Sequence, residues 1–348
     1  MKIRDTSATE RAAFRRCRRQ WLLGTVHRLD PQEGNVHTFL GTIYHYALQA
    51  YYEAVKAGHD PVDARDAALD AFQSAYDVEV DVIRAQLGFL AVQGLPPFKE
   101  MAKLGMEMLQ NYLDREETDP LLDEVVAVET RVNVAIKRPG GKQRVGTLSV
   151  QADVVGIKDG ELSVADHKTA SRAVRSAHLD LDDQLTAEVY AWWQHSGDWP
   201  ERAIYNVSYK KHAGAPKQLK SGKLSKAKDQ GTTHALYLQE IHRLGLEPAD
   251  YVDILLFLVE RERRGEDPLF RRETVFRTPG QMDAFARDLY HEYRDMKDVA
   301  AHPERAYPNP TADNCARCDV RSVCTTIQDD GDVSAVITND FVVAEPRR

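Results

Sequence analysis

The amino-acid pattern changes abruptly near residue 124, and this change constrains the fold more than any other feature of the chain. Apolar and polar residues begin to alternate there with a strong β-branched bias, which is typical of strands. The expected elements are strands at 124–136, 144–157, 161–167 and 204–210, and a helix at 180–195. Asp159-Gly160 has the composition of the turn between the second and third strands. Strands, helix and strand in this order predict an α/β core.

Helical spacing of apolar residues dominates the rest of the chain. Further helices are expected at 6–24, 38–56, 61–93, 98–117, 232–244, 249–264 and 279–299, with one more strand at 270–277. Pro96 and Pro97 interrupt the pattern between two of these helices. The resulting division is an N-terminal helix (1–30), a helical insertion (31–122), a core (123–215), a lysine-rich loop with helices and a strand (216–306), a cysteine segment (307–326) and a tail (327–348). The acidic tail is expected to be loosely held.

Composition excludes several classes of protein. The chain has 348 residues, of which 43% are hydrophobic and 29% charged, so it has enough apolar content for a sizeable core. No apolar run has the length of a membrane span, and the charged start of the sequence lacks the apolar stretch of a secretory signal. We therefore expect a soluble, cytoplasmic protein without membrane contact.

The net charge of −8 does not favour binding of a polyanion by the protein as a whole, but the basic residues are unevenly distributed. Five arginines lie between Arg11 and Arg19, and seven lysines lie between Lys210 and Lys228. Local basic patches can bind phosphates on an acidic protein. The lysine run is interpreted either as a solvated loop or as a mobile basic flap that contacts nucleic acid.

Two acidic residues and a lysine are expected on one face of the predicted hairpin. Side chains alternate along a strand, so Asp166 and Lys168 project to the same face while His167 points away. The turn at Asp159-Gly160 brings Asp153 close to that face. Two converging carboxylates make an oxygen-rich site suited to Mg²⁺ or Mn²⁺. The alternative is a surface group of salt bridges, but both acids interrupt apolar strands, where a charge is costly unless it binds something.

The chain resembles the PD-(D/E)XK nucleases of the RecB type in Gln151-Ala152-Asp153 and in the segment Asp166-His167-Lys168-Thr169. The resemblance implies a restriction-endonuclease-like mixed central sheet flanked by helices. It also implies that Asp153, Asp166 and the main chain of His167 hold a metal ion and that Lys168 serves the attacking water.

The same resemblance extends to a helical Gly-x-x-x-His motif and to a later glutamine and tyrosine. Gly41-Thr42-Ile43-Tyr44-His45 has the form of the first motif, and it implies that His45 joins the metal site. Gln184 and Tyr190 are assigned to the second motif, although their spacing of six differs from the spacing of four that is typical of these nucleases. Without the resemblance, the sequence alone would suggest that His45 is a structural histidine and that Tyr190 is a residue of the core.

Four cysteines are grouped as one plus three, at Cys17 and at Cys315, Cys318 and Cys324, which indicates a metal site. Four thiolates can ligate either a zinc ion or an iron–sulfur cluster. The arrangement resembles the iron–sulfur staple of AddB-type nucleases, in which a [4Fe–4S] cluster joins the two ends of the chain. The resemblance therefore implies a structural cluster, with a Cys₄ zinc site as the alternative.

Together these features predict a stand-alone, metal-dependent DNA nuclease. We expect an exonuclease that acts on single strands or duplex ends in repair, recombination or processing, with protein partners from such a complex. The chain has no Gly-x-x-x-x-Gly-Lys-Ser/Thr motif, which argues against a fused helicase motor. The alternatives are a non-catalytic nucleic-acid-binding subunit and a zinc-stapled DNA-binding module.

Overall fold

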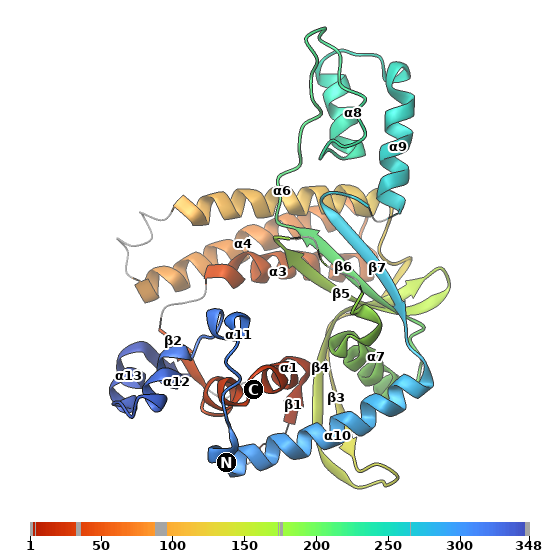
Figure 1. Ribbon diagram of the computed structural model, residues 1–348. Helices are drawn as coiled ribbons and strands as arrows, with labels where there is room; N and C mark the ends of the chain where they lie inside the picture. Colours follow the sequence, from red (N-terminus) through yellow and green to blue (C-terminus); the bar gives the residue numbers. More distant parts are fainter. Residues whose placement is uncertain are drawn as a thin grey trace.

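A six-stranded mixed sheet forms the centre of the molecule (Figure 1). This computed structural model describes residues 5–32, 36–87, 96–172, 177–264 and 266–344, with Ile3 and Val174. The strands are β1 (Asp5–Ser7), β3 (Glu124–Lys137), β4 (Arg144–Lys158), β5 (Glu161–Ala170), β6 (Arg202–Tyr209) and β7 (Phe270–Phe276). Their order is β1-β4-β5-β6-β7, and β3 pairs with β4. The α/β class and the mixed sheet that were expected from the sequence are confirmed.

The pairing directions show how the strands are connected. β3, β4 and β5 are antiparallel neighbours, as the Asp159-Gly160 turn predicts, whereas β5 and β6 are parallel. A parallel pair needs a crossover connection, and helix α7 (Asp183–Ser196) provides it. β1 precedes the predicted core at 123–215 and β7 follows it, so the sheet extends beyond that core.

Three long helices cover one face of the sheet, and two cover the other (Figure 1). The first layer consists of α3 (Val36–Lys56), α4 (Pro61–Leu87) and α6 (Pro96–Thr118). Gly105 brings α6 close to α3, because a Cβ atom at this position would lie 2.4 Å from Leu40 Cδ1. The second layer consists of α7 and α10 (Pro279–Ala301). Each layer buries its own apolar cluster against the sheet.

The boundaries of these helices differ from the sequence expectations in two places. Pro96 and Pro97 begin α6 rather than interrupt the chain, because proline fits the first turn of a helix, where no N–H partner is needed. The helix expected at 61–93 is α4, which ends at Leu87; residues 88–93 lie outside the described residues.

The single helix expected at 6–24 is wrong. Cys17 has an extended backbone, with φ −160°, and separates α1 (Ala8–Arg16) from α2 (Arg18–Trp21). A π-helix, η1 (Leu22–Val26), continues α2. The break turns Cys17 toward the C-terminal part of the chain, where its Sγ accepts the Asn309 N–H at 3.4 Å.

The two ends of the chain pack together. The C-terminal elements are η4 (Pro303–Arg305), α11 (Ala312–Ala316), α12 (Arg321–Gln328), α13 (Val333–Asp340) and β8 (Phe341–Val343). β8 pairs with β2 (Leu29–Pro31) near the N-terminus, and Phe341 is buried with Leu23 and Val323. The expectation of a loosely held tail is therefore wrong for residues 327–344, because these apolar side chains anchor them; residues 345–348 lie outside the described part.

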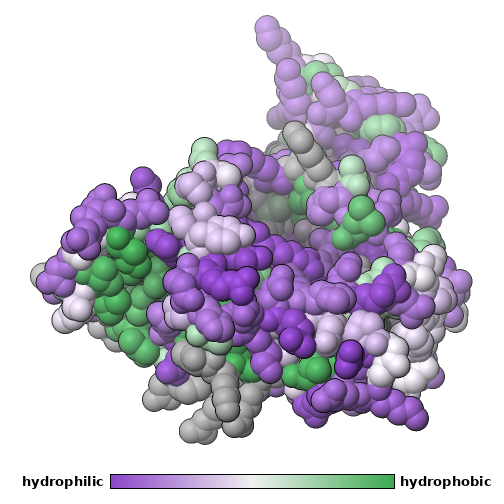
Figure 2. Space-filling view, turned by 60° about the horizontal axis from the view of Figure 1, so that its bottom comes forward, coloured by the Kyte–Doolittle hydropathy of each residue, from purple (hydrophilic) through white to green (hydrophobic). Residues whose placement is uncertain are grey.

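Residues 211–268 form an arm that projects from the sheet between β6 and β7, and Figure 2 shows it standing apart from the rest of the molecule. It contains α8 (His234–Arg243), η3 (Pro248–Tyr251) and α9 (Val252–Arg263) around a small apolar cluster of its own. The lysine-rich residues 217–228, which we call the lysine loop, fold onto this cluster through the buried Leu224. The flap interpretation is corrected in this respect, because the loop packs on the arm.

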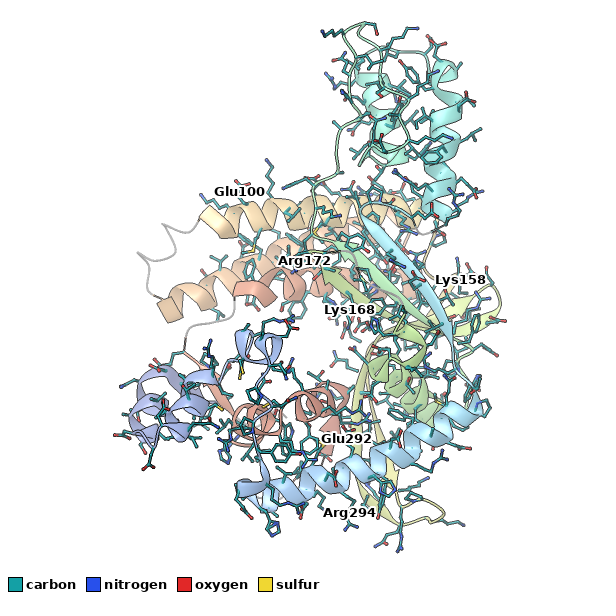
Figure 3. The ribbon with its side chains drawn as sticks, viewed as in Figure 1. Glu100, Lys158, Lys168, Arg172, Glu292 and Arg294 are labelled. Carbon is teal, nitrogen blue, oxygen red and sulfur yellow. The ribbon has the colours of Figure 1, made fainter. Side chains whose placement is uncertain are left out.

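Two of the N-terminal arginines are engaged within the protein rather than free to bind a polyanion. Arg11 is fully buried and forms ion pairs with Asp183 and Glu292, and Arg15 pairs with the same two carboxylates. Figure 3 labels Glu292 on α10, next to α1. Since Asp183 is the first residue of α7, these arginines fix the start of the helix that carries Gln184.

Candidate active site

The hairpin of β4 and β5 brings the two predicted acids together. Val154 pairs with Ala165, so the same antiparallel register sets Asp153 opposite Asp166. The Asp153 Oδ2 atom accepts the main-chain N–H of His167 at 2.8 Å. Asp166 is 1% exposed, so it is buried at the centre of the molecule.

Asp166 is held by two side chains at one of its oxygens. Its Oδ1 atom accepts hydrogen bonds from Lys168 Nζ at 2.7 Å and from Gln184 Nε2 at 2.8 Å. Figure 3 labels Lys168 on β5, between α3 and α7. The Asp166 Oδ2 atom is buried without a hydrogen-bond partner. A buried carboxylate oxygen without a partner is costly, and a bound cation would satisfy it.

A third buried carboxylate, Glu188, lies next to this pair and was missed from the sequence. Its Oε1 atom accepts a hydrogen bond from Gln184 Nε2 at 3.1 Å, and its Oε2 atom is buried without a partner. Burial, followed by repulsion from Asp166, raises the pKa of Glu188 well above its ordinary value. Residues four apart are neighbours on a helix, so the typical spacing of four from Gln184 could have identified this position.

Helix α3 and strand β3 add two more groups on the exposed side of the site. The His45 Nδ1 atom lies 3.7 Å from Asp153 Oδ2. Within the described residues, His45, Glu129 and Asp153 each offer a ligand atom, and these three atoms lie within 4.8 Å of one another. His45 was predicted to belong here. Glu129 was not, because the predicted strand 124–136 contained no signal that distinguished it from its neighbours.

The electrostatics of the site follow from its burial. Burial raises the pKa of Asp153 and the pKa of Asp166 to about 6, in spite of the nearby lysine. Burial alone would lower the pKa of Lys168, but attraction to Asp166 and Glu188 raises it above its ordinary value. Burial, followed by repulsion from Lys168, lowers the pKa of His45. At neutral pH the site therefore holds a neutral imidazole, a fixed ammonium group and carboxylates that are poorly solvated.

These residues fit a divalent metal ion. Carboxylate oxygens are the ligands that Mg²⁺ and Mn²⁺ prefer, and a neutral imidazole can join them. Asp153, Asp166 and His45 would hold the ion, with the main-chain carbonyl of His167 as the further ligand that the resemblance implies. Such an ion activates water and neutralises charge on a phosphoryl group. Lys168 stays protonated at Nζ, so beside such an ion it would stabilise developing negative charge and would not accept the proton of the water.

The side chains of the other two residues assigned from the resemblance, His167 and Tyr190, lie away from the carboxylates, although the main chain of His167 contacts Asp153. The His167 side chain is buried on the opposite face, as strand alternation predicts, where it stacks on Tyr52 and contacts Asn206. Tyr190 lies in the second apolar layer and packs against Phe285. The structure thus brings Gln184 to the site but does not bring Tyr190 there.

The four cysteines lie near one another without forming a compact ligand group. Burial raises the pKa of Cys318 and the pKa of Cys324, and repulsion between neighbouring thiolates, Cys17 and Cys315 among them, adds to it. Among the described residues, however, no three of their sulfur atoms lie within 4.8 Å of one another. The expected staple is therefore not present as a tight four-sulfur cluster; the ends of the chain are joined by β2, β8 and the contact between Cys17 and Asn309.

A cleft of about 1020 Å³ opens onto the carboxylates. Its walls come from the N-terminus of α1, from α3 and from the strands β3 and β4, and it ends near Lys210. Polar and charged side chains dominate this lining, including Gln49, Arg131 and Gln151. A wide polar cleft with buried acids at its base is suited to a charged, extended ligand rather than to a small apolar one.

The fold and the site define the class of the protein: a mixed sheet that presents two carboxylates and a lysine from adjacent strands, as metal-dependent nucleases do. The family description "PD-(D/E)XK nuclease superfamily" matches residues 5–325, and the chain belongs to this superfamily. No curated protein matches the chain by sequence. None of the helices within the described residues has the length and apolar character of a membrane span.

Proposed function

We propose that the protein is a metal-dependent DNA nuclease that hydrolyses phosphodiester bonds as an exonuclease on single strands or duplex ends. One observation carries the proposal: Asp166 is buried with one oxygen held by Lys168 and Gln184 and the other without a partner. If Asp166 only formed salt bridges within the protein, both of its buried oxygens would be expected to have hydrogen-bond partners. Asp153 and Asp166 then hold the ion, and Lys168 stabilises the charge of the transition state.

The cleft and the arm support a nucleic acid as the substrate. The cleft reaches from the buried carboxylates to Lys210, where the arm begins. All five lysines of the lysine loop are exposed on the arm: Lys217, Lys220, Lys223, Lys226 and Lys228. Phosphate contacts of this kind position a strand without reading its sequence.

The test is cleavage of DNA labelled at one end, with Mg²⁺, Mn²⁺ or EDTA. We expect linear single strands to be shortened from an end in the presence of either ion, and closed circular single strands to remain intact. Cleavage of the circles would replace the exonuclease by an endonuclease. Binding of DNA without cleavage under every metal condition would favour the non-catalytic subunit and contradict the proposal.

We further propose that the chain is of the RecB/AddB type and that Cys17, Cys315, Cys318 and Cys324 ligate a [4Fe–4S] cluster. The grouping of one cysteine near the start of the chain and three near its end supports the proposal, because four thiolates can ligate such a cluster. A zinc ion held by the same four thiolates is the alternative. The cluster would add a covalent link between chain ends that already pack together.

Iron and zinc content after anaerobic purification tests this assignment. We expect four iron atoms per chain and a brown protein, since a [4Fe–4S] cluster needs them. Cys17→Ser should lose the iron and lower the melting temperature. A colourless protein that contains one zinc ion would contradict the cluster, and retention of iron by Cys17→Ser would remove Cys17 from the ligand set.

A further inference from the structure

Helix α9 of the arm has apolar residues on all sides. Every residue from Ile254 to Val259 is apolar, and at 3.6 residues per turn a run of this length extends around the whole helix. A helix that is apolar all round is typically buried on every side. α9 instead belongs to an arm that stands apart from the rest of the molecule (Figure 2). The question is therefore which sides of α9 the arm itself covers.

The arm covers two neighbouring sides of α9. Ile254 and Leu258 are buried in the apolar cluster of the arm, together with residues of α8, which lies beside α9 (Figure 1). On the next side, Lys228 of the lysine loop lies over the Phe257 ring, with its Nζ atom 4.8 Å from the ring centre. The remaining apolar positions of α9 lie on the outer side of the arm.

The outer side of α9 carries an apolar stripe. Val252 is 48% exposed and Leu256 is 63% exposed, and Leu255 and Val259 beside them are partly exposed. Residues spaced by three, four and seven positions lie along one face of a helix, so these four side chains form a single surface. The same spacing is typical of helices that pack lengthwise against another helix. The exposed fractions show that the described part of the chain leaves this stripe open to solvent.

The charges at the two ends of α9 have opposite signs. Asp250 and Asp253 lie exposed at the start of the helix, and Arg263 and Arg264 lie exposed at its end. Of these four side chains, only Arg264 has an ion-pair partner within the residues that the structure describes, the exposed Glu266. A second α9 laid antiparallel would bring the acidic start of each helix to the basic end of the other, with the helix dipoles opposed. A parallel arrangement would instead place like charges together.

We propose that the outer face of α9 binds the same face of a second copy of the chain, as an antiparallel pair of helices related by a two-fold axis. The partner is a second copy because the face is complementary to itself in charge, as a two-fold interface requires. No residue of the arm lines the cleft at the carboxylates, so the dimer leaves the candidate active site open. α9 is about 18 Å long, so the contact is smaller than a standard interface and the dimer dissociates on dilution.

Sedimentation velocity of the full-length protein over a wide range of concentrations tests the proposal without any assay of activity. We expect the wild type to change from monomer to dimer as its concentration rises. Leu256→Asp should raise the dissociation constant about 100-fold, because a two-fold axis places the change in the contact twice and each buried leucine contributes about tenfold or more. Leu181→Asp is the matched control: it replaces a leucine that is 84% exposed between β5 and α7, and it should dimerise as the wild type does.

Reversal of the charges tests the antiparallel direction. Changing Arg263 and Arg264 to glutamate should weaken the dimer about tenfold, because acids then face acids at both ends of the contact. Changing Asp250 and Asp253 to arginine in the same chain should restore the dimer, and this recovery also shows that the variants fold. A wild type that stays monomeric at every concentration, a dimer that Leu256→Asp leaves unchanged, or a failure of the second pair of changes to restore the dimer would overturn the proposal.

Discussion

Replacing Asp153 by asparagine should stabilise the metal-free protein, although it removes a proposed ligand. Burial raises the pKa of Asp153 from 3.8 to about 6, because the ionised carboxylate is poorly solvated and Glu129 repels it. A difference of this size corresponds to about 3 kcal/mol of unfolding free energy above pH 6. Asparagine is neutral, and its oxygen can still accept the His167 N–H that Asp153 accepts at 2.8 Å.

The unfolding free energy should depend on pH, and the sign of this dependence follows from the fact that folding raises the pKa of Asp153. The folded protein holds the Asp153 proton more tightly than the unfolded chain does, so ionisation of Asp153 destabilises the fold as pH rises from about 4 through 6. The unfolding free energy of Asp153→Asn should therefore exceed that of the wild type by about 3 kcal/mol at pH 8 and by about half of that at pH 5. The assay is urea denaturation in EDTA at both pH values, with the exposed Asp198→Asn as the matched control.

In the presence of Mn²⁺ the wild type should become more stable than Asp153→Asn, the reverse of the order expected in EDTA. An ion that binds only the folded state stabilises it in proportion to the logarithm of its concentration over Kd. The unfolding free energy of the wild type should rise with Mn²⁺, and that of Asp153→Asn should rise much less because the variant lacks one of the proposed metal ligands. If Asp153→Asn is no more stable than the wild type in EDTA at pH 8, or if its gain does not depend on pH, the account of this carboxylate is wrong.

Four further results are expected. Lys168→Ala should abolish cleavage while Mn²⁺ still binds, because the ammonium acts on the transition state; full activity would remove Lys168 from the mechanism. Arg11→Met should lower the unfolding free energy by about 3 kcal/mol in urea denaturation, because it removes the fully buried partner of two half-buried carboxylates and leaves them only Arg15, and an unchanged midpoint would refute this. Glu188→Ala should reduce kcat about tenfold or more, whereas Tyr190→Phe should not, and the opposite result would favour the tyrosine. Substituting Lys217, Lys220 and Lys223 of the lysine loop by glutamine should weaken DNA binding and flatten its salt dependence, and parallel slopes would show a solvated loop.

Local signals were enough to predict five of the six strands of the central sheet and to place the two acids of the candidate site together, but they did not predict β1. Alternation and the Asp159-Gly160 turn give β3, β4 and β5 within a few residues, and they place Asp153 and Asp166 side by side. These elements are consecutive in the chain, so a short-range pattern determines their pairing. The position of His45 needed the resemblance to known nucleases, because no local pattern relates a helix of the insertion to a distant strand.

Other features depend on contacts that no local pattern reveals. Glu129 is one of several polar residues on its strand, and only the distorted backbone and the approach of α3 set it apart. The break at Cys17 and the packing of the tail through Phe341 depend on the meeting of the two chain ends. The composition of the lysine loop predicts a solvated segment, but the buried Leu224 anchors the loop to the arm.

The proposed nuclease activity depends on a divalent ion held by Asp153 and Asp166. The most direct measurement is the rate of nucleotide release from end-labelled linear single-stranded DNA by metal-depleted protein, before and after Mn²⁺ is restored, for the wild type, Asp166→Ala and Asp198→Ala. We predict no release without metal, full recovery in the wild type and in Asp198→Ala, and none in Asp166→Ala. Release by metal-depleted wild type, or recovery in a folded Asp166→Ala variant, would contradict the account.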